Sequence, residues 1–582
     1  MPIVNRVTLT TTGDFQDGLD ATGPHQLVLN FAPVSTTGLA ANGIADFGQG
    51  AHVINRDAIT LTGDGGINIL VVGDHPDVSN FAVLSNLGAS IDPDGIPFDG
   101  DETFAEGIVV AGDHFSVTDR GDIIVTGDLG AGIEADGSDG RIENDSTLSA
   151  PGDSAVGIVA VGARDVAVNN GAINVGFAGA GVLLVGDNGS ITNTGAVSAV
   201  GDFAIGLIGV GDREAITNAH GATVTSQGFE AFGIYAQGNN GSISNAGQVI
   251  VSGEVNFGLI VEGANGFITN TGAVSATGDV ERAAYIQDHS TLVNRGDLGA
   301  DGQSALGALV LGDGNSIQNF GSIHTTGMGG AGLQVGFDVN PGAGQAITNW
   351  GSILATGDSS WAVGLFASQS SLLNHGLIAA TGAPLTVNGV TVAANGLDVF
   401  GDEDTITNAG DGRVYSHNAA SPAVEINVDT PFVTANPLTH TSLENDGLIH
   451  GDGLAILGGA ASEAVFNFGR IEGDVNLGGG ADRFEAESGG VLAGTLTLGG
   501  GADTLALHHN FGALTVADFT PGGAAHDVLD VSALGIKTLS AFLSSASQSG
   551  GDVVVNLGHG DVLTLKSLTL ASLTAGDFIF AH

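Results

Sequence analysis

The stretch that decides the fold is residues 181–205, GVLLVGDNGSITNTGAVSAVGDFAI. It contains three short aliphatic runs, at 182–185, 191–193 and 197–200, separated by corners that contain Gly and often Asp. Gly supplies the positive φ that tight corners need, and Asp can hydrogen-bond its own backbone there. The stretch therefore predicts one coil of three short β-strands.

The phrase aliphatic–any residue–Asn recurs about every 25 residues, a period typical of a stacked solenoid. Its last position is occupied by Asn5, Asn30, Asn55, Asn86, Asp119, Asn144, Asn169, Asn193, Asn218, Asn245, Asn270, Asn294, Asn319, Asn349, Asn374, Asn408, Asn445 and Asn467. We predict an all-β, right-handed parallel β-helix of about 18 coils over residues 1–469, with an irregular insertion near 383–440. The first phrase, Ile3-Val4-Asn5, favours an open first coil that pairs with another molecule.

Strand alternation places Ile191, Asn193, Val197 and Ala199 on one face, and the aliphatic residues make that face the interior. A buried amide needs partners, which the Asn residues of neighbouring coils can supply. We therefore predict that the repeated Asn residues form an internal structural ladder without a catalytic role.

The first strand of each coil is apolar at successive positions. One column comprises Ile158, Val182, Leu207, Ile234, Leu259, Ala308, Leu333 and Leu365; the adjacent column comprises Val159, Leu183, Ile208, Tyr235, Ile260, Leu309, Gln334 and Phe366. Because successive strand residues face opposite sides, one apolar column must lie outside. A continuous outer stripe indicates an interaction surface, unless a loop covers it. We take the second column as the candidate stripe.

Composition excludes several classes of partner. Thirteen Lys and Arg oppose 63 Asp and Glu, for a net charge of −50, which repels nucleic acid and anionic membranes. The acidity suits Ca²⁺, or serves only to keep a Gly-rich chain in solution. There is no Cys, hence no disulfide framework, and no apolar run reaches the ~18 residues of a membrane span.

Two copies of one Gly-rich phrase follow the solenoid, VNLGGGADRF at 475–484 and LTLGGGADTL at 496–505. They resemble the nonapeptide of the repeats-in-toxin family, in which Gly turns and an Asp bind Ca²⁺ between half-coils. The resemblance implies calcium at Asp482 and Asp503. Plain solenoid corners are the alternative.

The C-terminal phrases VADFTPG at 516–522, DVLDVSA at 527–533 and LTAGDFIFAH at 573–582 also resemble a known family. They are similar to the secretion domain of repeats-in-toxin proteins exported by type I secretion systems of Gram-negative bacteria. The resemblance covers about residues 470–582. It implies a β-roll and secretion-signal domain there, the type I machinery as a partner, and a secreted or cell-surface location.

These observations favour a secreted structural protein that self-assembles, head-to-tail or laterally, into a filament, surface layer or biofilm matrix. A monomeric adhesin or a carbohydrate- or ice-binding β-helix is the alternative, with cell-surface polysaccharide as its partner. A polysaccharide lyase, epimerase or hydrolase is disfavoured, because no Lys precedes Lys537 and lyases need cations beside the uronate carboxylate. A hydrolase needs two carboxylates about 5–10 Å apart, for which 383–440 is the place to look. We expect no enzymatic activity.

Overall fold

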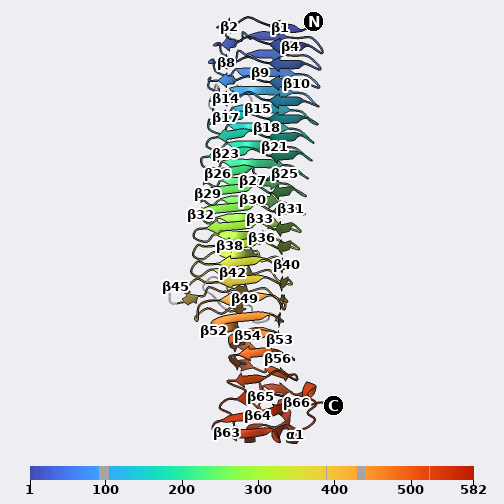
Figure 1. Cartoon of the computed structure of the whole chain (residues 1–582), viewed down its shortest axis with the longest axis vertical. Helices are drawn as coiled ribbons and strands as arrows, with labels where there is room; N and C mark the ends of the chain where they lie inside the picture. The colour runs from blue at the N-terminus through green and yellow to red at the C-terminus, as the bar shows by residue number, and fades with distance from the viewer. Residues whose placement is uncertain (91–103, 338, 388–389, 429–439, 524) are drawn as a thin grey trace. The chain divides into compact units, whose positions relative to one another are not determined.

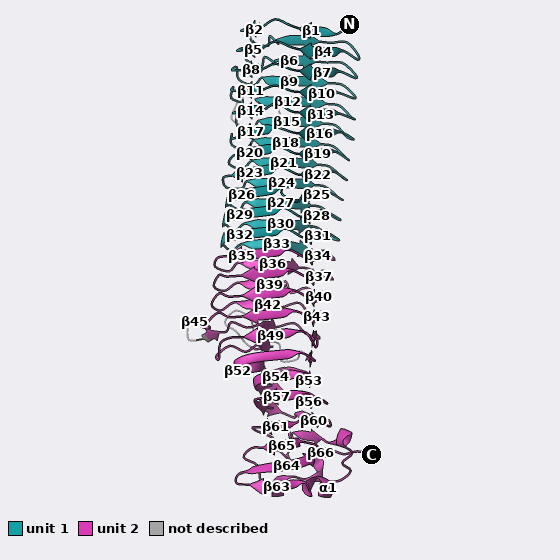
Figure 2. Ribbon diagram, in the orientation of Figure 1, with its two compact units in different colours: residues 1–287 teal, residues 288–582 magenta. Residues whose placement is uncertain are grey.

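The computed structural model describes residues 1–90, 104–337, 339–387, 390–428, 440–523 and 525–582. It confirms the parallel β-helix: each coil contains a long strand, a strand ending in the repeated Asn, and a third strand (Figure 1). The chain divides into two compact units, residues 1–287 and 288–582 (Figure 2), which are described separately. The predicted boundary at 469/470 stays a prediction.

In unit 1, each type of strand pairs in parallel with its equivalent in the next coil. The long strands are β3 (Leu19–Ala21), β6 (Ile44–Asp46), β9 (Ile67–Val72), β12 (Glu106–Ala111), β15 (Ala131–Asp136), β18 (Val156–Val161), β21 (Ala180–Val185), β24 (Ile205–Val210), β27 (Phe232–Gln237), β30 (Phe257–Glu262) and β33 (Arg282–Gln287). The Asn strands are β1 (Ile3–Asn5), β4 (Leu27–Asn30), β7 (His52–Asn55), β10 (Asp77–Asn80), β13 (Ser116–Asp119), β16 (Arg141–Asn144), β19 (Val166–Asn169), β22 (Ser190–Asn193), β25 (Ala215–Asn218), β28 (Ser242–Asn245) and β31 (Phe267–Asn270). The third strands are β2 (Leu9–Thr11), β5 (Val34–Thr36), β8 (Ile59–Leu61), β11 (Leu84–Asn86), β14 (Ile123–Val125), β17 (Thr147–Ala150), β20 (Ala172–Val175), β23 (Ala196–Val200), β26 (Thr223–Phe229), β29 (Gln248–Glu254) and β32 (Ala273–Asp279).

Unit 2 is built from the same type of three-strand coil, with more variable lengths. Its long strands are β36 (Leu306–Leu311), β39 (Ala331–Val335), β42 (Trp361–Leu365), β47 (Leu397–Val399) and β50 (Val424–Ile426). Its Asn strands and their successors are β34 (Thr291–Asn294), β37 (Ser316–Asn319), β40 (Ala346–Asn349), β43 (Ser371–Asn374), β48 (Thr405–Asn408), β51 (His440–Asn445), β53 (Ser462–Asn467), β56 (Arg483–Ala486), β60 (Thr504–Leu507), β62 (Val528–Asp530) and β66 (Phe578–Ile579). Its third strands are β35 (Asp297–Asp301), β38 (Ser322–Thr325), β41 (Ser352–Ala355), β44 (Leu377–Ala380), β49 (Arg413–Ser416), β52 (Leu448–Gly458), β54 (Arg470–Asn476), β57 (Val491–Ala493), β58 (Thr495–Thr497) and β61 (Ala513–Val516).

The remaining elements of unit 2 depart from this plan. The hairpin β45 (Leu385–Val387) and β46 (Val390–Val392) is antiparallel, and β55 (Gly479–Gly480) pairs with β59 (Gly500–Gly501). Near the C-terminus, helix α1 (Leu539–Leu543) precedes an antiparallel set, β63 (Ala546–Ser549), β64 (Asp552–Gly558) and β65 (Asp561–Leu565). Short 3-10 turns lie at Ser532–Leu534, Leu570–Ser572 and Ala575–Asp577. No helix in the described ranges is long and apolar enough to cross a membrane.

The long strand contains a local irregularity that decides which side chains face outward. In β18, Gly157 and Ile158 are both buried, whereas Val156 and Val159 are half-buried. A Cβ on Gly157 would lie 2.4 Å from the Gly181 carbonyl oxygen and 2.4 Å from the side chain of the core residue Ile173. Only Gly fits there. Three outward positions per long strand result, the first, fourth and sixth.

Candidate functional site

The repeated Asn side chains form hydrogen-bonded ladders inside the coils. In unit 1 each Nδ2 donates to the next Oδ1 at 2.7–2.9 Å, from Asn5 to Asp119 and again from Asn144 to Asn270. In unit 2 the ladder runs from Asn294 through Asn319, Asn349, Asn374, Asn408 and Asn445 to Asn467. A buried amide with paired donor and acceptor is a structural group, because its chemistry is used internally.

The position assigned from sequence to Asn86 belongs instead to Asn80, which accepts from Asn55 and donates to Asp119. Both Val78-Ser79-Asn80 and Leu84-Ser85-Asn86 match the repeated phrase, and pattern alone does not separate them. Asn86 is buried on β11, where its Nδ2 donates to the carbonyl oxygens of Gly66 and Glu106. The assignment of Asn86 is therefore wrong.

Asp119 interrupts the unit 1 ladder because a carboxylate has no N–H to donate. Its Oδ2 accepts instead from the hydroxyl of Ser146 (2.6 Å), which also lies 3.3 Å from the Oδ1 of Asn144. Burial raises the pKa of Asp119 to about 6. The hydroxyl thus replaces the missing donor, but a buried charge remains.

Asp119→Asn is expected to stabilise unit 1 at pH 8 by about 1–3 kcal/mol, because it removes that charge and supplies the missing donor. The gain should shrink as the pH falls below about 6, where Asp119 is already protonated. Urea unfolding at pH 5 and pH 8 measures both effects. A variant less stable than the wild type at pH 8 would contradict this account.

The candidate stripe lies on the outward side of the long strands of unit 1. Val159, Leu183 and Tyr235 are half-buried there, whereas Ile208 (8% exposed) and Ile260 (4%) are covered by their neighbours. The register aligns all five with one another.

The other two outward positions of β18, β21, β24, β27 and β30 are also mostly apolar. They carry Val156, Val161, Ala180, Val185, Ile205, Val210, Phe232, Gln237, Phe257 and Glu262. Together with the stripe, these residues form what we call the outer face. Phe232 stacks on Phe257, with ring centroids 5.5 Å apart, and the Tyr235 hydroxyl hydrogen-bonds Glu262.

Charged residues bound the outer face at both ends. On the N-terminal side lie Glu106, Glu134 and Asp136, and burial together with the nearby Glu134 raises the pKa of Glu106. On the C-terminal side, Arg282 lies with its guanidinium carbon 5.1 Å from the ring centre of Phe257. The N-terminal end is thus acidic, whereas the C-terminal end combines the cation Arg282 with the acids Glu262 and Glu281.

In unit 2, Leu309 is covered by its neighbours (3% exposed) in the same way as Ile260, and register pairs it with Gln334 as predicted. Register then pairs Gln334 with Gly364 rather than with Phe366. The assignment of Phe366 is two residues out of register, because the longer coil changes the count from one long strand to the next. A Cβ on Gly364 would lie 2.2 Å from Nε1 of Trp361. The Trp361 side chain therefore packs directly against Gly364.

Asp482 and Asp503 lie in a column of stacked carboxyl groups that we call the acid column, completed by Glu463 and Asp527. Asp482 Oδ1 accepts from the amide of Glu463 (2.9 Å), and Asp503 Oδ1 from the amide of Asp482 (2.8 Å). Asp527 Oδ1 accepts in turn from the amide of Asp503 (3.3 Å). Each of the three Asp carboxyl groups therefore holds the corner of the preceding coil.

The acid column is almost completely buried, at 2% exposure or less. Burial raises the pKa of Asp503 to about 7 and also raises those of Glu463 and Asp482, with the charge of Asp482 raising Glu463 further. Both oxygens of Glu463 and Oδ2 of Asp482 and of Asp503 are buried without a hydrogen-bond partner. Such oxygens fit either a hard cation such as Ca²⁺ or protons shared between neighbouring carboxyl groups, as between Glu463 and Asp482.

A surface hollow of about 360 Å³ adjoins the acid column. Its lining includes Glu463 and, from earlier coils, Asp404 and Thr441. Arg483 also lines the hollow, and Glu463 is the member of the acid column that lines it.

One further buried carboxyl pair, Asp398 and Glu425, lies in the irregular stretch 383–440, of which 388–389 and 429–439 lie outside the described residues. The two face one another in register on β47 and β50, and Asn395 Nδ2 donates to Glu425 Oε2 at 2.7 Å. Burial raises the pKa of Glu425 to about 7. With exposures of 3% and 5%, neither carboxyl offers a surface to a polymeric substrate.

Searches found no family model and no curated protein that matches the chain. A solved structure described as "The cryo-EM structure of the Vag8-C1 inhibitor complex" is similar, with a TM-score of 0.46 and 15% identity. The similarity covers 88% of this chain and 100% of that chain. The class that the coils themselves define is a β-solenoid repeat protein.

Proposed function

We propose that the chain is an exported, extracellular structural protein whose β-solenoid assembles with copies of itself through the outer face. The observation that carries this proposal is the apolar character of three adjacent outward columns over five coils. Isolated surface aliphatic residues are ordinary, but a contiguous apolar patch marks an interaction surface.

The size of the outer face suits a contact between two copies. Five strands about 4.8 Å apart and six residues of about 3.3 Å each give about 24 by 20 Å, or about 480 Å². Two such faces bury about 1,000 Å² in total, the lower limit for a specific interface. An interface of this area is expected to be of modest affinity, and repetition of the contact would strengthen an assembly.

An antiparallel arrangement of the copies suits the charges around the face. A twofold axis along the strand direction brings β33 of one copy, with Arg282, against β15 of the other, where Glu134 lies three residues further along the strand. Opposite charges at the rim fix register and suppress wrong pairings. The occupant that fits the face is therefore a second copy of this chain.

Export is the second part of the proposal. Its support is the resemblance of residues 470–582 to type I secretion substrates. Within that segment the buried carboxyl group of Asp577 accepts from the amides of Gly522 (2.8 Å) and Thr574 (2.7 Å), which fixes the local fold. We propose a secreted or cell-surface location in a Gram-negative bacterium.

A carbohydrate-binding alternative has less support. Phe320, Trp350 and His375 form an exposed stack, with centroids 4.5 and 5.9 Å apart and planes within 2°. Arg295 covers the outer side of Phe320 at 4.1 Å. Sugars stack on free ring faces, whereas these faces pack on one another. We do not propose an enzymatic activity.

Leu183→Glu and Phe232→Glu are each expected to weaken self-association of the full chain at least about tenfold, because a carboxylate must then be buried in the contact. The matched control is Thr217→Glu, on the outward side of an Asn strand, which should associate like the wild type. Light scattering after size-exclusion chromatography, with negative-stain imaging, measures assembly, and circular dichroism checks folding. A wild type that stays monomeric at about 0.1 mM, or a control as impaired as the two variants, would refute the proposed contact.

A further inference from the structure

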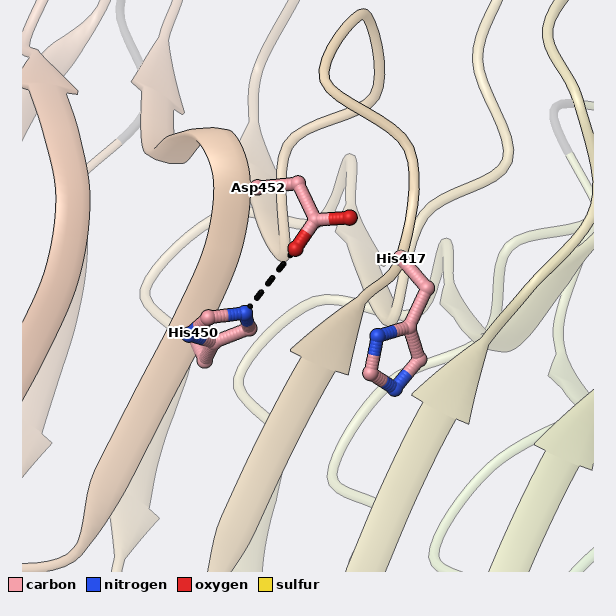
Figure 3. A group of neighbouring side chains, drawn as sticks. All are labelled: His417, His450 and Asp452. Atoms are coloured by element: carbon pink, nitrogen blue, oxygen red, sulfur yellow. Dashed lines mark hydrogen bonds and ion pairs between the residues drawn. The ribbon is translucent and has the colours of Figure 1, made fainter.

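Three metal-ligating side chains meet at the surface of unit 2, outside the features discussed above. His450 and Asp452 belong to β52, and His417 follows β49, the strand that pairs with β52 (Figure 3). One ligand atom from each lies within 4.8 Å of the others, and His450 Nε2 is 3.0 Å from Asp452 Oδ1. His417 and Asp452 are exposed, and His450 is half-buried.

The backbone around Asp452 is built irregularly. The ladder between β52 and β54 shifts register between His450 and Leu454, a β-bulge that contains Gly451, Asp452 and Gly453. A Cβ on Gly451 would lie 1.8 Å from the Leu454 carbonyl oxygen, so Gly is required there. Bulges of this kind often redirect a side chain at a functional site.

A carboxylate behind His450 supplies an independent indication of metal binding. His450 Nδ1 lies 2.9 Å from Glu472 Oε2, and Arg470 Nε donates to Glu472 Oε1 at 2.5 Å. A carboxylate that accepts from one ring nitrogen orients the imidazole and directs the other nitrogen to a metal.

We propose that His417, His450 through Nε2, and Asp452 bind a divalent metal of the Zn²⁺ class, with Glu472 as the positioning residue. Two imidazoles and a carboxylate are ligands that Zn²⁺ accepts at about 2.0–2.2 Å, with ligand atoms about 3.3 Å apart in a tetrahedron. The pair of His450 and Asp452 already has this spacing. His417, stacked on Tyr415 at a centroid distance of 5.5 Å, closes the remaining gap by a side-chain rotation.

Three protein ligands leave one coordination position for water, as in open zinc sites. A metal ion binds only unprotonated ligand atoms, so protons compete with it and binding weakens in acid.

A second cluster, Glu485, Glu487 and His508, provides a matched control within the same unit. There His508 Nε2 lies 3.3 Å from Glu485 and Nδ1 3.4 Å from Glu487, so carboxylates occupy both ring nitrogens. Arg483 donates to Glu485. Carboxylates face both ring nitrogens of His450 as well, so the difference is that this second cluster contains one imidazole where the proposed site contains two.

The test is calorimetric titration of Zn²⁺ into the metal-stripped full chain, with excess Ca²⁺ present to saturate other acidic groups. We expect one Zn²⁺ per chain, affinity lowered more than about 100-fold by His450→Gln, and 10–100-fold lowered by Glu472→Gln. His417→Gln should weaken binding, and His508→Gln should leave it unchanged. The Co²⁺-loaded chain should show tetrahedral visible absorption that Glu472→Gln alters, a change that a merely structural role would not produce.

Circular dichroism establishes that each variant is folded. Absence of Zn²⁺ binding by the wild type, loss of binding in His508→Gln, or a Glu472→Gln variant identical to the wild type in affinity and Co²⁺ spectrum would each overturn the proposal. The site does not depend on the proposed self-assembly, because its ligands lie in unit 2 and the outer face lies in unit 1.

Discussion

Unit 2 of the calcium-free chain is expected to lose stability as the pH rises from about 4 to 8, and millimolar Ca²⁺ is expected to restore it at pH 8 only. The carboxyl groups of the acid column have pKa values raised above the unfolded value of about 4. Their stabilising contribution is fully present below pH 4 and is lost as the pH rises through the folded pKa, about 7 for Asp503. The loss approaches about 1.4 kcal/mol per pH unit for each proton released.

A cation bound to the partnerless oxygens of Glu463, Asp482 and Asp503 would reverse this loss. At a concentration 100 times its dissociation constant, Ca²⁺ adds about 2.7 kcal/mol to the free energy of unfolding. At pH 4.5 protons compete for the same oxygens, so the effect of Ca²⁺ should disappear.

The double variant Asp482→Asn/Asp503→Asn isolates the acid column from other buried acids with raised pKa values, such as Asp404. It should unfold at a higher urea concentration than the wild type at pH 8 without Ca²⁺, and it should not respond to Ca²⁺. Urea unfolding at pH 4.5 and pH 8, with Ca²⁺ or with chelator, gives the four values required. If the double variant keeps the full response to Ca²⁺, the cation binds elsewhere.

Asn218→Ala is expected to lower the stability of unit 1 by about 2–4 kcal/mol, the second large effect. Asn218 Oδ1 accepts from Asn193 (2.9 Å), and its Nδ2 donates to Asn245 (2.9 Å) and to the Gln248 carbonyl oxygen (3.3 Å). Truncation leaves buried polar atoms on both neighbours without these bonds, at about 1–3 kcal/mol for each orphaned group. It also opens a cavity in the interior.

Thr217→Ala is the matched control, because Thr217 is next in the same strand and faces outward; its effect should stay within about 0.5 kcal/mol. Hydrogen exchange should show lost protection in β22, β25 and β28, since each coil of a solenoid contacts only its neighbours. Asn218→Asp should lower the stability of unit 1 more at pH 8 than at pH 5. The carboxylate of Asp119 accepts from Ser146, which lies two residues after the next ladder residue, Asn144. The equivalent residue for position 218 is Gly247, two residues after Asn245, and it has no hydroxyl group. Equal stability of Asn218→Ala and the wild type would show that the ladder contributes little.

Much of the fold could be predicted from sequence because its period is local. The corner residues and the aliphatic runs of 181–205 define a coil without knowledge of distant contacts. The register between coils could not be predicted reliably. Two neighbouring phrases, ending in Asn80 and Asn86, both match the repeat, and the longer coil before Phe366 changes the number of residues between equivalent strand positions. In both cases the hydrogen-bonded neighbour decides, and the neighbour is known only from the folded chain.

The sites were less accessible to prediction. The repeated Gly-rich phrase pointed to Asp482 and Asp503, but Glu463 and Asp527 lie in unrelated local sequences. Phe232 and Phe257 were missed because the Gly at the second position of the long strand breaks strict alternation. His417 and His450 are brought together by coils of irregular length. The spacing of these residues in the sequence therefore does not predict that they lie close together.

The Asn ladder has a consequence for how such a chain can change. Its rungs keep hydrogen bonds of 2.7–2.9 Å although their separation along the chain varies from 22 to 39 residues. The corner of each coil that contains the ladder Asn keeps the same position relative to the next coil, whereas the segment between one ladder Asn and the next can vary in length. Insertions can therefore accumulate at the other corners without disturbing the register of the next coil, and the solenoid can acquire or exchange surface loops one coil at a time. The same property makes it a scaffold into which foreign segments could be grafted.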